Sequence, residues 1–423
     1  MNGIREIPPA GRSGPAAADR RRWVVLAAGL LAMTAGCAFQ YGLPYLIPAL
    51  RAEGLSLRAA GLLAACPTAG LLVSLVAWGA AADRFGERLV LASGLGLAGL
   101  VLGAASAVRN PLALGACLVL AGAAGASVHA SSGRLILGWF AAHERGLAMG
   151  ARQTAQPLGV AVAAIALPPL ADTGRGVALA FLAGLCVLAA AVAAAVTRDP
   201  ARPPRPPDTP VASPYRTPLL WRIHAASALL VVPQFAVATF AVVFLVDAHG
   251  WSAQGAGRLL AIAQLGGAAA RLGAGVWSDR VGSRLLPMRI LATATAAILA
   301  VLALAAATRA AVATGSLLLA AVLAVSTNGL AFTAVAENAG PHWAGRALGI
   351  HNTGQNAVAA ATPPVLAALI DGHGYPTAFA ATIVFPLLAA AAVPARRRAG
   401  TATPARRAIR RQPPRAGAPH PDG

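Results

Sequence analysis

The sequence has no lysine, and charged residues of either sign are scarce. Only 11% of its 423 residues are Asp, Glu, Lys or Arg, whereas soluble domains average about 25%. There are 14 acidic residues, and all 34 basic residues are arginine. A phosphate-binding loop of the G-x-x-x-x-G-K-[ST] type needs a lysine, so direct use of ATP is not expected. The shortage of charge excludes an ordinary soluble domain.

Cysteine and aromatic residues are also few. Cys37, Cys66, Cys117 and Cys186 lie inside apolar stretches without metal-ligand spacing, so we expect neither a disulfide framework nor a metal site. We expect no cofactor and no enzymatic activity, because no Ser-His-Asp or metal-binding cluster stands out. Aromatic residues make up 5% of the chain, which argues against a site for lipophilic drugs.

Long apolar runs fill most of the chain instead. Hydrophobic residues make up 57%, and the mean hydropathy is +0.66. About 20 apolar residues in a helix cross a hydrocarbon core of about 30 Å. The sequence therefore predicts an all-α polytopic membrane protein with 12 transmembrane helices. The expected spans are 23–50, 58–81, 89–107, 112–140, 146–171, 176–197, 219–246, 255–278, 288–307, 311–337, 344–370 and 376–394.

The spans form two groups of six, at 23–197 and 219–394. Between them lies a Pro- and Arg-rich linker, 198–218, which we expect in the cytoplasm. The N-terminal arm, 1–22, and the tail, 395–423, are basic, and we expect both to be disordered. Arginines concentrate on the side of both termini, which predicts cytoplasmic termini in a plasma membrane (the inner membrane of a bacterium). Only a minority lie opposite, namely Arg51, Arg58, Arg109, Arg175, Arg258 and Arg309.

The net charge of +20 would suggest nucleic acid in a soluble protein. Here the densest clusters, Arg20–Arg22 and Arg396–Arg398, flank the outermost spans. That placement favours anionic lipid at the cytoplasmic tails as the partner, and we expect no nucleic acid.

A charge-bearing decapeptide occurs twice. Residues 79–88, GAAADRFGER, and 275–284, GVWSDRVGSR, share the pattern G-x-x-x-D-R-x-G-x-R, and each follows the second span of its half. A second repeat opens spans 5 and 11, where RGLAMGARQTAQP (145–157) matches GRALGIHNTGQNA (345–357). The chain therefore contains two related halves.

The repeated decapeptide resembles the signature loop between helices 2 and 3 of major facilitator superfamily transporters, with its second copy between helices 8 and 9. The resemblance covers residues 20–395 and implies two pseudo-symmetric six-helix bundles that work by alternating access. It also implies that Asp83 meets the start of span 11 and Asp279 the start of span 5, where helix N-termini favour a carboxylate.

We therefore expect a latch that holds the cytoplasmic side shut, although the loops could also merely set topology through positive charge. Glycines would permit close helix approach and tight turns. Glu337 is the expected partner of Arg280 or Arg284, and Glu144 could serve the first half. The expected gating residues are Gly79, Asp83, Arg84, Gly86, Arg88, Gly275, Asp279, Arg280, Gly282, Arg284 and Glu337.

Polar residues inside the spans indicate a binding site, because ionisable groups at membrane depth are costly. Glu337 is the one acid that we place within a span, at its cytoplasmic end. A mid-membrane arginine without a counter-carboxylate favours a small organic or inorganic anion, with Arg152 as its main charge partner. Arg134 is expected to be structural, and for Arg271 a structural and a substrate role are weighed evenly. The candidate substrate-binding residues are Arg152, Gln153, Gln156, His129, Gln264, Arg271, His351, Asn352, Gln355 and Gln40.

The missing mid-span acid casts doubt on proton symport through such a group. His129 or His351 could titrate instead, and anion exchange and facilitated diffusion stay open. The alternatives to a small-anion transporter are an efflux transporter for drugs or metabolites and a membrane sensor that does not transport. We expect a monomer.

Overall fold

The structure, a computed structural model, describes residues 15–200 and 212–394, and all regular elements in those two ranges are helical. In chain order the helices are α1 (Pro15–Gly42), η1 (Leu43–Leu46), α2 (Ile47–Ala52), α3 (Leu57–Phe85), α4 (Glu87–Ala107), α5 (Pro111–Gly125), α6 (Ser127–Trp139), α7 (Arg145–Arg152), α8 (Ala155–Thr173), α9 (Arg175–Val196), η2 (Pro214–Arg216), α10 (Pro218–His249), α11 (Ala253–Val281), α12 (Leu285–Thr308), α13 (Val312–Ser326), α14 (Asn328–Ala339), α15 (Ala344–Thr382) and α16 (Val384–Ala392).

Eleven stretches of the described chain are long and apolar enough to cross a membrane. The last of them, Ala344–Ala392, has 49 residues, which at 1.5 Å each would span about 74 Å and is too long for a single crossing. Gly374 lies inside it with non-helical φ 81° and ψ 172° and divides it into two helices. The twelve-helix membrane fold predicted from the sequence is therefore confirmed.

Two corresponding crossings are each built from two helices in tandem. The fourth crossing breaks between Gly125 and Ser127, and the tenth breaks between Ser326 and Asn328.

In the first half, Gln40 donates from Nε2 to the carbonyl oxygen of Pro67 at 2.9 Å, at the proline inside α3. This bond joins α1 to α3 beside the proline.

Some boundaries differ from those expected. Helix α1 begins at Pro15, so the expected disordered arm does not extend to residue 22. The linker is bounded by α9, which ends at Val196, and by α10, which begins at Pro218. The expectations for residues 1–14, 201–211 and 395–423 lie outside the described residues.

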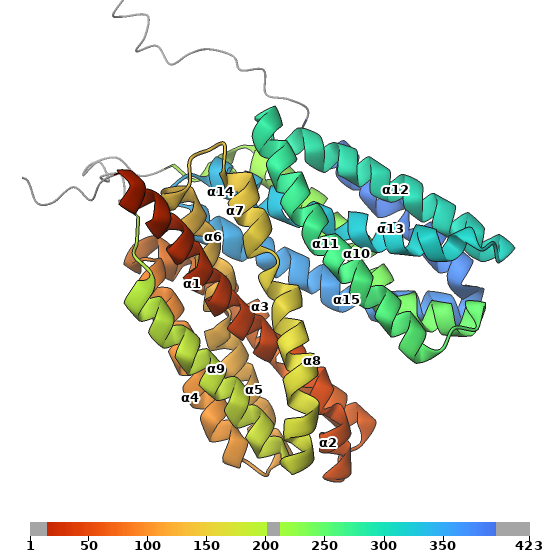
Figure 1. Ribbon diagram of the computed structural model, residues 1–423, viewed down its shortest axis with the longest axis horizontal. Coiled ribbons are helices and arrows are strands. Elements are labelled where there is room, and N and C mark those ends of the chain that lie inside the picture. The colour runs from red at the N-terminus through yellow and green to blue at the C-terminus, as the bar shows by residue number, and fades with distance from the viewer. Residues whose placement is uncertain (1–14, 201–211, 395–423) are drawn as a thin grey trace, which may run out of the picture.

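The helices pack as two groups, α1–α9 and α10–α16 (Figure 1). One buried apolar cluster lies wholly between residues 25 and 193, and another wholly between 237 and 379. Small residues allow close packing within a group. A Cβ added to Gly70 would lie 2.7 Å from the backbone nitrogen of Ala123, and one added to Gly122 would lie 2.5 Å from the Cα of Pro67. Such contacts replace hydrophobic driving force in a bilayer.

The two groups meet at one end and diverge toward the other (Figure 1). We call the end where they meet the terminal side, because α1 and α10 begin there and α9 and α16 end there. A buried apolar cluster joins the halves at this end, with Ile136 and Met149 from the first half and Leu220 and Phe332 from the second. The structure is therefore closed at the terminal side.

Candidate functional site

The two motif aspartates cap helices of the opposite half. The Asp83 carboxylate accepts hydrogen bonds from the backbone N–H groups of Gly345 at 2.8 Å and Arg346 at 3.0 Å, in the first turn of α15. Asp279 accepts from the N–H groups of Gly146 at 3.0 Å and Leu147 at 2.9 Å, in the first turn of α7. These are the starts of spans 11 and 5, as the resemblance implied. Each carboxylate satisfies two free N–H groups and lies at the positive end of a helix dipole.

Glycines bring the same helices into backbone contact. The backbones of Gly79 and Gly345 approach so closely that a Cβ on either would clash with the other residue's carbonyl oxygen, and the same holds for Gly275 and Gly146. The turns also need glycine. Gly86 has φ +97° and Gly282 has φ +63°, a region that other residues rarely adopt.

A buried arginine neutralises the first-half motif. Arg134 on α6 donates to the carbonyl oxygen of Ala82 at 2.7 Å. Its guanidinium also lies 2.9 Å from Glu87 Oε1 and 3.4 Å from Asp83 Oδ1. Glu87 is the first residue of α4 and is fully buried. The prediction that Glu337 is the one acid within a span is wrong, because the turn between α3 and α4 is Gly86 alone and Glu87 already begins a span.

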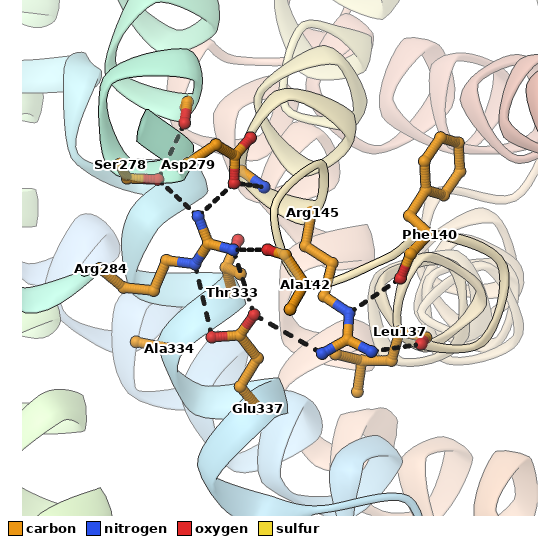
Figure 2. A network of polar contacts seen from close by, with 12 residues as sticks. Leu137, Phe140, Ala142, Arg145, Ser278, Asp279, Arg284, Thr333, Ala334 and Glu337 are labelled. Atoms are coloured by element: carbon orange, nitrogen blue, oxygen red, sulfur yellow. Dashed lines mark hydrogen bonds and ion pairs between the residues drawn. The ribbon is translucent and has the colours of Figure 1, made fainter. Parts of the chain in front are cut away.

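The second-half motif is neutralised from the loop (Figure 2). Arg284 pairs with Asp279 and, at 3.2 Å, with Glu337 of α14, which also lies 3.7 Å from Arg145. Arg284 donates further to the hydroxyl of Ser278 at 2.7 Å. Burial alone would lower the pKa of Arg284, but the carboxylates of Glu337 and Asp279 outweigh it and raise the pKa. Of the two expected partners of Glu337, the structure selects Arg284.

The remaining motif arginines lie at the edge of this network. Arg84 is exposed, and its guanidinium carbon lies 5.2 Å from the ring centroid of Phe85. Arg88 donates from Nε to the carbonyl oxygen of Ala194 at 2.7 Å, within its own half, and Arg280 is exposed. Glu144 pairs with Arg22 of α1 at 2.6 Å. The expectation that Glu144 serves the first-half motif is therefore wrong, because α1 lies closer to it.

A polar pocket lies between the halves, beyond the apolar cluster that joins them. Its volume is about 40 Å³, room for a few water molecules. None of its lining residues is a carboxylic acid. The lining consists of Met33, Tyr41, His129, Gln153, Gln156, Val231, Gln234, Phe235, Asn328, Phe332, Asn352, Gln355, Asn356 and Ala359.

Hydrogen bonds join the two halves across this pocket. Tyr41 donates from its hydroxyl to Asn356 Oδ1 at 3.1 Å, and Asn352 donates from Nδ2 to the carbonyl oxygen of His129 at 3.2 Å. The Nε2 of His129 is buried and, among the described residues, has no hydrogen-bond partner. The pocket therefore offers amide, phenol and imidazole groups.

Arg152 lies directly behind the pocket. The side chain is 1% exposed. It donates from Nε to Ser132 Oγ at 2.8 Å and from Nη1 to Gln153 Oε1 at 2.7 Å, and from Nη2 to the carbonyl oxygen of His129 at 3.1 Å. The face of Phe332 lies 5.2 Å from its guanidinium carbon. Its hydrogen-bond partners are thus all neutral, and two of them line the pocket.

Five of the ten expected substrate residues line the pocket, namely His129, Gln153, Gln156, Asn352 and Gln355. Besides Arg152, four expected residues lie outside the lining: Gln40, His351, Gln264 and Arg271. Gln40 is bonded to Pro67, and His351 is bonded to side chains of α10. Gln264 is exposed. Arg271 is 4% exposed and donates weakly to the carbonyl oxygen of Val325 at 3.4 Å.

Four further polar residues line the pocket, namely Tyr41, Gln234, Asn328 and Asn356. They belong to the polar groups within the spans from which the sequence predicts a binding site, although they are not among the ten candidate substrate residues. Phe332 and Met33 give no such signal in the sequence, because apolar residues at helical spacing are indistinguishable from core.

Known proteins resemble this chain along nearly its whole length. Residues 28–363 match the Major Facilitator Superfamily. An uncharacterized MFS-type transporter of Mycobacterium tuberculosis, Rv2994, is 45% identical over 379 residues, covering 89% of this chain and 85% of the relative.

Solved structures share the fold. The fucose:proton symporter FucP of E. coli superposes with a TM-score of 0.69 at 14% identity, covering 88% of this chain and 98% of the symporter. The human organic anion transporter MFSD10 superposes with a TM-score of 0.67 at 16% identity, covering 90% of this chain and all of MFSD10. At such low identity these two matches show the fold alone.

Proposed function

The chain belongs to the Major Facilitator Superfamily of membrane transporters, and we propose that it carries a small organic or inorganic anion by alternating access. The observation that carries this proposal is the environment of Arg152. Arg152 is a buried arginine beside a pocket lined without any carboxylate, and all its hydrogen-bond partners are neutral. A buried cation is costly unless paired, so an anionic cargo would supply the missing partner.

Arg152 needs only a small rearrangement to reach a cargo. Its Nη1 donates to Gln153 Oε1, and Gln153 itself lines the pocket. An anion in the pocket would compete with that neutral acceptor, because opposite charges add a Coulomb attraction that a neutral amide lacks. The pocket volume of about 40 Å³ favours a small cargo over a bulky one.

The aspartate caps would close the terminal side during the cycle. Each cap joins the two halves through backbone N–H groups at a helix start. Rocking of the halves about the pocket would break both caps and expose the pocket to the terminal side. We place residues 23–197 and 219–394 as the two moving bodies, and the caps as the latch.

We further propose a bacterial inner membrane with both termini in the cytoplasm. The support is the concentration of arginine on the terminal side. In that orientation the closed terminal side faces the cytoplasm. Because both halves of the pocket come from one chain, the working unit would be a monomer.

The test uses purified protein in detergent and a panel of probes: acetate, succinate, phosphate, sulfate, nitrate and the lipophilic cation tetraphenylphosphonium. We expect at least one anion to raise the melting temperature of the wild type and to be taken up by proteoliposomes. Arg152→Gln should lose that stabilisation. Arg271→Gln is the matched control, because Arg271 is a buried span arginine outside the pocket lining. Stabilisation by the cation alone, or an unchanged anion effect in Arg152→Gln, would contradict an anionic cargo and favour efflux of cationic compounds.

A further inference from the structure

A chain of polar side chains runs through the second half from the terminal side to the pocket. The hydroxyl of Tyr215 lies 2.9 Å from His224 Nε2, and His224 Nδ1 lies 3.0 Å from His351 Nδ1. On its other side, His351 Nε2 lies 3.2 Å from Ser227 Oγ. Gln355, which lines the pocket, donates from Nε2 to that same hydroxyl at 2.7 Å. Each link is within hydrogen-bond distance.

Helical spacing produces this chain. His224 and Ser227 are three residues apart on α10, and His351 and Gln355 are four apart on α15, so each pair lies on one helix face. The side chains become more deeply buried along the chain of hydrogen bonds. Tyr215 and His224 are half-buried near the start of α10, whereas His351 is 2% exposed. The chain thus links a region near the terminal side to a site about seven residues into α15.

Two histidines bonded through their Nδ1 atoms leave both Nε2 atoms free for other partners. In a neutral pair only one Nδ1 carries the shared hydrogen, so the chain has two arrangements that differ in which ring donates. In one, His351 donates to His224; in the other, His224 donates to His351. A hydrogen-bonded chain with two such arrangements is able to pass a proton.

We propose that His224 and His351, extended by Tyr215 and Ser227, conduct protons between the terminal side and the pocket. A proton from the pocket binds the hydroxyl oxygen of Ser227, and the hydroxyl's own proton moves to Nε2 of His351. The Nδ1 proton of His351 then moves to Nδ1 of His224, and His224 releases its Nε2 proton toward Tyr215. One proton enters and one leaves, and both rings end as the opposite tautomer.

Charges around the pair would couple this path to cargo. Phe332 packs edge-on against His351, with ring centroids 4.7 Å apart, and holds Arg152 on its face. On the other side, Arg346 lies over Trp343, which borders Tyr215. Among the described residues no carboxylate bonds to either imidazole. The Arg152 charge therefore disfavours a proton on His351, and an anion beside Arg152 would remove that penalty.

This coupling rests on the proposed anion transport, but the path itself does not. It also answers how a chain without a mid-span acid could use a proton gradient. The histidine pair would carry an extra proton when the pocket holds an anion and would lose it when the pocket is empty. The cycle would then be an anion–proton symport.

The first test uses proteoliposomes that enclose a pH-sensitive dye, with the anion panel named above. We expect the wild type to acidify the lumen when a transported anion is added outside. His224→Gln and His351→Gln should each reduce that proton flux at least tenfold while retaining exchange of the labelled anion across the membrane at equal pH. His373→Gln, an exposed histidine near the opposite end of the second half, should keep both activities. Anion uptake by the wild type without proton flux, or undiminished proton flux in His351→Gln, would overturn the proposal.

The second test needs no cargo. Protein labelled with ¹⁵N-histidine in nanodiscs is titrated from pH 5 to pH 9 by NMR. A coupled pair requires that His351→Gln shift the titration of His224, whereas His373→Gln leaves it unchanged. Equal His224 titration curves in the two variants would overturn the path. Because this result does not depend on transport, absence of any anion uptake would count against the proposed function alone.

Discussion

At the scale of single residues, each motif aspartate shares an arginine with a glutamate. Arg134 pairs with Asp83 and Glu87, and Arg284 pairs with Asp279 and with Glu337. The two halves differ in which partner lies outside the motif. In the first half the arginine, Arg134, lies on α6 of the fourth crossing, and in the second half the glutamate, Glu337, lies on α14 of the tenth crossing. A second arginine completes each group, because Arg346 lies 3.2 Å from Asp83 and Arg145 lies 3.7 Å from Glu337.

Removal of Arg134 should therefore be costly. Arg134→Met leaves the buried Glu87 without its cation and Asp83 with Arg346 alone, and breaking a buried ion pair in this way destabilises a protein by about 3–5 kcal/mol. We expect a large drop in melting temperature in detergent. Adding Glu87→Gln should restore part of the loss, because one uncompensated carboxylate is then removed. Arg88→Met is the control, because Arg88 is exposed. Equal melting temperatures for Arg134→Met and Arg88→Met would show that the pair carries no stability.

Sequence reasoning identified the motif residues but not this partnership. The repeat exposes Asp83 and Asp279, because both recur in the same pattern. Arg134 and Glu87 have no such counterparts, and their pairing depends on how α6 packs against α3 and α4. Long-range packing of this kind leaves no local trace in the sequence.

At the scale of helices, the glycines decide how closely the halves approach. A Cβ on Gly275 would clash with the backbone of Gly146 in the other half, whereas a Cβ on Gly273 would meet nothing within 4 Å. Both lie in α11, so glycine-to-alanine substitution should add a similar gain in helix propensity, about 1 kcal/mol, at either position. Gly275→Ala should therefore open the terminal side, and Gly273→Ala should not.

Spin labels report this opening. Leu89→Cys at the start of α4 and Leu286→Cys at the start of α12 are exposed label sites in opposite halves, in a background with the four native cysteines replaced. We expect a longer label-to-label distance in Gly275→Ala than in the parent and an unchanged distance in Gly273→Ala. Identical distributions in all three proteins would mean that the close contact is not needed for closure.

Helices were the most predictable level, because span length follows from hydropathy. Most observed ends fall within a few residues of those expected. The site was less predictable. Helical periodicity shows which residues share a face of one helix, but it does not show which other helix packs against that face. Gln264 lies on the exposed surface and Arg271 lies outside the pocket lining, although both are polar residues in one span. His351 corresponds to Arg152 in the repeat, yet it bonds to α10 and not to the pocket.

At the scale of the whole molecule, two related caps join the halves at the terminal side. The cap at Asp83 joins α3 to α15, and the cap at Asp279 joins α11 to α7. Loss of a capping side chain typically costs about 0.5–2 kcal/mol, and about 1.4 kcal/mol changes a two-state population ratio tenfold. Because the two aspartates cap different helices and share no partner, their contributions should be roughly additive.

Aspartate-to-alanine variants test this prediction with the same label pair. Asp83→Ala should raise the population with a long terminal-side distance, and the double variant with Asp279→Ala should raise it further. Asp83→Asn separates the cap from the ion pair, because asparagine keeps an acceptor oxygen for the helix N–H groups but loses the charge that Arg134 neutralises. If the cap dominates, Asp83→Asn should resemble the parent; if the charge dominates, it should resemble Asp83→Ala. A double variant with the parent's distance distribution would show that the apolar cluster between the halves suffices for closure and that the aspartates are not a latch.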